Sequence, residues 1–171
     1  MATNFWANPT TEPKRQHRFV VFVDKFEPWL AVKVTRPSFT VGTAQHGYLN
    51  HNFYYPGKVE WQPVDLTIVD AGPTIDTTNS LYEILLESGY VFPEDPEERS
   101  TISKAGAVGS MGVVTIKELD ASGAITSNFS LVNAWIQSVS LGEFDYGADG
   151  ILQMSLTLRY DYAKYGLGDT F

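Results

Sequence analysis

The chain has 171 residues, no cysteine, an aromatic content of 13% and a formal net charge of −8. The length suits one domain with a full core, and the missing cysteines exclude a disulfide framework and thiolate chemistry. The acidic balance argues against a general grip on nucleic acid, which normally needs a basic face. The chain contains neither a signal peptide nor a membrane-length apolar run, so we expect a soluble cytoplasmic protein.

An N-terminal arm is predicted over residues 1–17, because prolines break regular structure there. A free tail rarely carries large apolar side chains such as Phe5 and Trp6. Two interpretations stay open: these side chains fold back on their own domain, or they dock on a neighbouring subunit. The cluster Lys14, Arg15, His17 and Arg18 is typical of a solvated face.

Several β-strands are predicted next. Residues 19–25 are apolar on both alternations, which favours a strand covered on both faces. Residues 29–35 and 38–44 also read as extended. A strand–turn–strand unit is predicted over residues 47–69, with the turn at Pro56-Gly57 and an edge or bulge at Pro63.

One helix is predicted, over residues 75–88, as a lid on a sheet face or barrel end. Ser80 and Glu83 match a capping box, Asn79 is an alternative cap, and Gly89 supplies the stop. Residues 90–111 then form a long irregular loop with an acidic run. Such a loop needs a reason, either disorder or contact with a neighbour.

The C-terminal half predicts a strand at 112–119, a turn at 120–123 and a return strand from Ala124. A long antiparallel hairpin follows over residues 131–162. Asp149-Gly150 favours a loop at residues 147–150, with Tyr146 facing Ile151. That register separates an apolar face from a polar face. Residues 163–171 are predicted to be a loose tail.

No catalytic site can be assembled from the sequence. Gly106, Gly109 and Gly112 do not have the spacing of a phosphate-binding loop. His46 and His51 are not spaced as a usual metal pair, and the carboxylates are scattered over turns and loops. We therefore predict no enzyme activity, no metal and no cofactor. What remains is a set of features typical of assembly: an arm, a long loop and a two-faced strand.

Three stretches resemble the tail-tube proteins of contractile-tailed bacteriophages (myoviruses). They are PGKVEWQPVDLTIVD at 56–70, the helix with its following irregular segment, and NAWIQSVSLGEFDYGADGILQMSLTLRYDY at 133–162. The resemblance covers most of residues 18–162. It implies a small antiparallel β-barrel or sandwich of about 6–8 strands with one flanking α-helix. The secreted ring protein of type VI secretion systems is similar in fold.

The resemblance also implies partners. Hexameric rings stack into a hollow tube inside a contractile sheath, between a baseplate or tube initiator and a terminator. The genome and the tape-measure protein pass through this virion component during DNA ejection, with no membrane contact and no sequence-specific DNA binding. The tail is assembled in the host cytoplasm.

Residues can be assigned to these expected surfaces. A lumen strand needs one polar face, which the main hairpin offers in Ser138, Ser140, Thr157 and Arg159. A net negative lumen would let DNA slide, and Arg159 is then expected to pair with a carboxylate. Inter-subunit contacts are expected from Phe5, Trp6, Arg15, Glu94, Asp95 and Glu97. The alternative is a monomeric ligand- or carbohydrate-binding β-sandwich.

Overall fold

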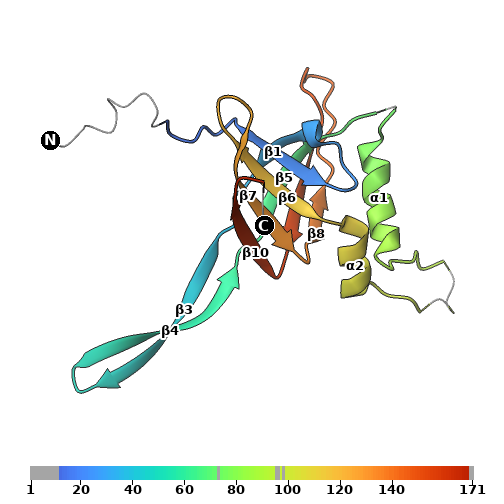
Figure 1. Ribbon diagram of the computed structural model, residues 1–171. Helices are drawn as coiled ribbons and strands as arrows, with labels where there is room; N and C mark the ends of the chain where they lie inside the picture. The colour runs from blue at the N-terminus through green and yellow to red at the C-terminus, as the bar shows by residue number, and fades with distance from the viewer. Residues whose placement is uncertain (1–11, 73, 95–96, 98, 170–171) are drawn as a thin grey trace.

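Two four-stranded antiparallel sheets face each other across one apolar core (Figure 1). The computed structural model describes residues 12–72, 74–94, 97 and 99–169. One sheet has the order β1-β6-β7-β10 and the other β2-β5-β9-β8, while β3 and β4 form a separate hairpin. The strands are β1 Phe19–Val23, β2 Ala31–Val34, β3 Phe39–Tyr48, β4 His51–Trp61, β5 Val64–Val69, β6 Val114–Leu119, β7 Ile125–Val132, β8 Trp135–Ser140, β9 Gln153–Arg159 and β10 Tyr162–Leu167. The mainly-β antiparallel class is confirmed, with ten strands in the described residues rather than 6–8.

Period-2 alternation places the core. In β5, Val64, Leu66 and Ile68 are buried, and in β9 Met154, Leu156 and Leu158 are buried, while the residues between them point outward. Burying one such side chain stabilises the fold by about 1.5–3 kcal/mol. The two strands pair directly, so this register fixes a dry inner face and a polar outer face.

The predicted helix is α1, Thr77–Glu87. Leu81 and Ile84 enter the core, and Gly89, with φ of +104°, ends the helix as expected. The predicted capping box is wrong, because Asp76 is the N-cap. Its carboxylate accepts a hydrogen bond from the Asn79 N–H at 2.9 Å, which places Ser80 inside the helix.

The segment 90–111 is not irregular throughout, because a second helix, α2, occupies Lys104–Met111. The Ser103 hydroxyl caps it by accepting from the Gly106 N–H at 3.0 Å. Glycines lower helix propensity and hid this element in the sequence. Gly106 is needed for close packing, since a Cβ there would lie 2.6 Å from the Ser88 carbonyl oxygen at the end of α1. A short 3₁₀ turn, η2, covers Pro28–Leu30 and overlaps the start of the strand predicted at 29–35.

The turn predicted at Pro56-Gly57 is also wrong. These residues lie within β4 where its pairing with β3 shifts, and the hairpin turns instead at Leu49-Asn50. Pro56 is tolerated because β4 pairs only with β3 among the described residues, so its other edge needs no donor. A Cβ on Gly57 would come within 3.0 Å of the Gly42 carbonyl oxygen, so the glycine allows the backbones of β3 and β4 to approach closely at this shift.

The main hairpin has a longer loop than predicted. β8 ends at Ser140 and β9 begins at Gln153, and Ser138 faces Thr157 while Ser140 faces Ser155, with an irregularity near Gln137. Gly142, with φ of +82°, takes the chain out of the ladder early. Asp145 then accepts from the Gly147 N–H at 2.8 Å, and this Asx turn competes with the expected Asp-Gly turn.

The C-terminal tail is not loose where it is described. β10 pairs with β7, and the Asn128 side chain donates to the Gly168 carbonyl at 2.9 Å. The corner between β9 and β10 is fixed by Asp161, which accepts from Asn133 at 2.6 Å and Lys104 at 2.7 Å. These two donors lower the pKa of Asp161. In the sequence, apolar and polar residues alternate without a break through this corner, so the passage of the chain from the sheet of β9 to the sheet of β10 was not predicted.

Candidate assembly surfaces

The β3–β4 hairpin projects from the sandwich on the side away from α1 and α2 (Figure 1). Every residue from Phe39 to Glu60 is exposed. Its large apolar side chains are Phe39, Val41, Tyr48, Leu49, Phe53, Tyr54, Tyr55 and Val59. Because an isolated two-stranded hairpin is marginally stable in water, and this one is rich in exposed aromatics, it has the character of a contact surface.

The root of the hairpin is held firmly. Trp61 packs on Phe39, with ring centroids 5.2 Å apart, and on Tyr160 at 6.0 Å. The Tyr160 hydroxyl donates to the Gln62 carbonyl at 2.7 Å, and burial raises the pKa of this tyrosine. The direction of the hairpin is therefore set by the corner where β9 leaves its sheet.

The outer face of the β2-β5-β9-β8 sheet is polar. Ser138, Ser140 and Thr157 come together there, and Thr157 donates to Asp65 at 3.0 Å. Arg159 lies on the same face opposite Trp135, with no ion pair to another described residue. The sheet thus brings the four predicted lumen residues onto one surface, although the carboxylate partner expected for Arg159 is not found within the described chain.

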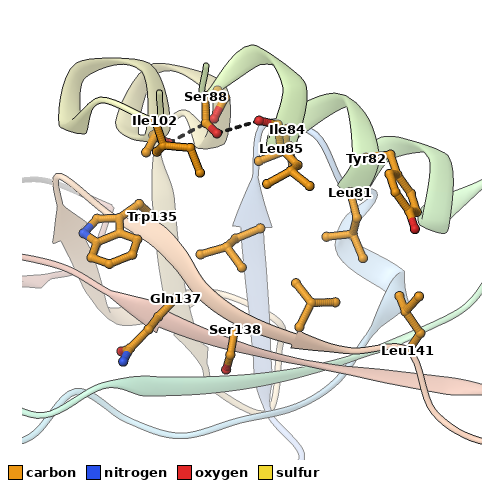
Figure 2. Close-up of a pocket in the computed structure, with 14 residues that line it drawn as sticks. Leu81, Tyr82, Ile84, Leu85, Ser88, Ile102, Trp135, Gln137, Ser138 and Leu141 are labelled. Atoms are coloured by element: carbon orange, nitrogen blue, oxygen red, sulfur yellow. Dashed lines mark hydrogen bonds between the residues drawn. The ribbon is translucent and has the colours of Figure 1, made fainter. Parts of the chain in front are cut away.

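An apolar groove runs between the helices and the edge strand β8 (Figure 2). In Figure 2, Leu81, Leu85 and Tyr82 of α1 lie across from Gln137, Ser138 and Leu141. We call it the α1–α2–β8 groove; its volume is about 460 Å³ and its lining is Leu81, Tyr82, Ile84, Leu85, Ser88, Ile102, Ala107, Ser110, Trp135, Ile136, Gln137, Ser138, Val139 and Leu141. None of these residues carries a charge.

Charged residues secure the base of the N-terminal segment. Glu118, whose side chain is 12% exposed, forms ion pairs with Lys14 and with Arg36 at 2.9 Å, and it accepts from Ser127. Burial alone would raise the pKa of Glu118, but Lys14, Ser127 and Arg36 together hold it below its usual value. The chain is therefore anchored at Lys14, just after the first described residues.

The residues predicted for subunit contacts are scattered. Phe5, Trp6 and Asp95 lie outside the described residues. Arg15 pairs with Glu12 at 3.7 Å within its own segment, and Glu94 and Glu97 are exposed beyond α1. The described residues contain no group of His, Asp or Glu side chains that could hold a metal ion, and no described helix has the length and apolarity to span a membrane.

No protein-family model and no curated protein matches this sequence. Solved structures do share its fold. A chain of the sheath/tube terminator of the extracellular contractile injection system PVC matches with a TM-score of 0.67 and 16% identity, covering 92% of this chain and 99% of that one. A chain of the PVC sheath-tube complex matches at 0.64 and 18%, covering 97% and 99%. The chain has a tail-tube-like fold.

A protein of a type six secretion system shares the tail-tube-like fold more distantly, with a TM-score of 0.50, 8% identity and coverage of 86% and 82%. The resemblance seen in the sequence is thus confirmed for the fold. The α1–α2–β8 groove was missed in the sequence, whereas the hairpin at residues 47–59 was expected to make contacts between rings but with its turn at the wrong place. One signal was available: residues 39–57 contain no Asp, Glu, Lys or Arg.

Proposed function

We propose that this chain is the structural subunit of the inner tube of a contractile tail. Hexameric rings would stack into a hollow tube, surrounded by a sheath and bounded by a baseplate or initiator and a terminator. The observation that carries the proposal is a sheet with a polar outer face, open edges at β2 and β8, and a projecting hairpin in one chain.

The sheet edges support the proposed ring. Among the described residues, β2 pairs only with β5, and β8 only with β9. An unpaired edge invites another strand, and closing sheets of several copies into a ring removes both edges. The polar face with Ser138, Ser140, Thr157 and Arg159 would then line the lumen.

The lumen would conduct the genome and the tape-measure protein during DNA ejection from a bacteriophage virion. The charges on this face are Lys33, Asp65 and Arg159. A net negative lumen therefore needs further acids, and the loop at residues 141–152 offers Glu143, Asp145 and Asp149 with no base. Sliding DNA is favoured by such a surface, because few phosphate contacts form.

Negative-stain electron microscopy of the purified protein across a concentration series tests the proposal. Rings or hollow tubes of uniform diameter are expected. A monomer at every concentration that binds glycans in a screen would overturn the proposal and favour the ligand-binding sandwich, for which the α1–α2–β8 groove with Trp135 is the candidate pocket.

A further inference from the structure

The tip of the β3–β4 hairpin carries an unusual residue. Leu49 occupies the turn with φ of +51°, a region that bulky residues rarely adopt and that Asn or Gly fills at less cost. The residue is 90% exposed. The turn itself does not explain a strained, exposed leucine, and such backbone outliers cluster at functional sites.

The α1–α2–β8 groove has the opposite property. It is concave, apolar and uncharged, and Leu85, Val139 and Leu141 on its lining are each more than one-third exposed. Covering these side chains would remove apolar surface from water. Among the described residues these side chains stay uncovered, and an apolar, uncharged segment would fit the groove.

We propose that the α1–α2–β8 groove of one copy receives Leu49 and Tyr48 from the hairpin tip of another copy. This inference rests on the proposed tube and names the acceptor for one of its contacts. The hairpin cannot reach its own groove, because β3 extends it by about 30 Å on the side away from the helices (Figure 1). The contact joins two different surfaces, so unless two copies exchange their tips it is heterologous, and a heterologous contact that does not close continues from copy to copy, as a stack requires.

Charge favours this occupant over the exposed apolar loop at residues 141–152. The loop at residues 141–152 presents Phe144 and Ile151, but it also carries Glu143, Asp145 and Asp149. Burying carboxylates without partners is unfavourable, and the groove offers no base. The hairpin tip at residues 47–52 has no carboxylate or ammonium group, and its ladder presents it in one conformation, which limits the entropy lost on docking.

Disulfide trapping tests the docking, since the chain has no cysteine of its own. In the full-length protein, Leu49→Cys is combined with Leu85→Cys, oxidised under assembling conditions and run on a non-reducing gel. A ladder of cross-linked copies is expected. Either single variant should give dimers at most. Matched pairs place the first cysteine at Phe144→Cys or at Trp6→Cys in the N-terminal arm.

The outcomes separate the two proposals. Tubes in the microscope without a Leu49→Cys/Leu85→Cys ladder would overturn the docking and leave the tube standing, as would a ladder only from Phe144→Cys or Trp6→Cys. A chain that never assembles would overturn both. A second test uses the variant Leu49→Asn, which removes the backbone strain at the turn and the apolar side chain proposed to enter the groove. We expect unfolding at an unchanged or higher temperature and a critical concentration for assembly raised about thirtyfold; an unchanged critical concentration would contradict the docking.

Discussion

Glu118 shows how one side chain can hold a segment that contributes little to the core. It joins Lys14, before the first strand, to Arg36, after β2, and all three lie at the end of β6. Arg36 also lies over the Phe129 ring at 5.4 Å, which restricts it further. The ion pairs are partly exposed, so their contribution is modest, but they fix where the N-terminal arm leaves the domain.

Glu118→Gln should lower the free energy of unfolding by about 1 kcal/mol at neutral pH, because Lys14 and Arg36 lose their charged partner. The folded pKa of Glu118 lies below its unfolded value, so the stabilisation is complete above the unfolded pKa of about 4.3 and is lost as the pH falls through the folded pKa. Urea unfolding of both proteins between pH 7 and pH 3 measures this. A difference that stays constant down to pH 3 would contradict the assignment.

Two glycines in α2 make a matched pair. A Cβ on Gly106 would meet the Ser88 carbonyl at 2.6 Å, whereas one on Gly109 would meet nothing within 4 Å. We expect Gly106→Ala to destabilise the fold by about 1–3 kcal/mol through the forced separation of α1 and α2. Gly109→Ala should be neutral or stabilise it by up to about 1 kcal/mol, as alanine favours the helix. Thermal unfolding compares them, and equal effects would refute the close packing.

Among the helices, strands and turns, the sequence predicted correctly those elements whose local sequence pattern agrees with their packing in the fold. α1 and β5 have clear periodicity, and Asp120-Ala121-Ser122-Gly123 forms the expected turn, with Asp120 accepting from Ser122 and Ala124. The prediction failed where one sequence pattern is compatible with two structures. Pro56-Gly57 lies at an irregularity in the pairing of β4 with β3 and not in a turn, and the glycines of α2 allow close helix packing instead of marking a loop.

The candidate surfaces could be predicted only in part. The polar face of β8 and β9 follows from alternation and survives a change of register, because Ser138 and Thr157 keep the same side. The α1–α2–β8 groove could not be foreseen, since it depends on an unrecognised helix and on contacts between distant segments.

Removing the outer part of the hairpin should separate folding from assembly. Replacing residues 43–56 with Asn-Gly leaves Phe39, Trp61 and the root packing in place. Because no residue from Phe39 to Glu60 is buried, we expect the unfolding midpoint to change by less than about 4 °C. Tubes should be absent. Calorimetry and electron microscopy check the two parts, and a truncated chain that still forms tubes would exclude the hairpin from stacking.

For the whole molecule, the net charge of −8 opposes the association of identical copies. The surfaces proposed to meet, the hairpin tip and the α1–α2–β8 groove, are uncharged, so no attraction between unlike charges offsets this repulsion. Association must therefore rely on apolar burial, and salt should assist it.

Raising sodium chloride from about 50 mM to about 500 mM should lower the critical concentration for assembly, since the screening length falls from roughly 14 Å to roughly 4 Å. Sedimentation velocity over a salt series measures the assembled fraction. Glu118→Gln serves as a control for ion pairs inside the chain, because it should follow the same salt trend. Salt-induced dissociation of assembled copies would instead show that intersubunit ion pairs dominate.

The root of the hairpin has a mechanical consequence. Trp61 between Phe39 and Tyr160 acts as the pivot of a lever about 30 Å long, so a rotation of about 5° at the root moves the tip by roughly 3 Å. A small side-chain change at the pivot is therefore magnified where copies would meet. We expect such changes to alter the angular step between successive copies before they alter the stability of any one copy. In the proposed assembly, three aromatic rings far from the contact points would then determine the helical geometry.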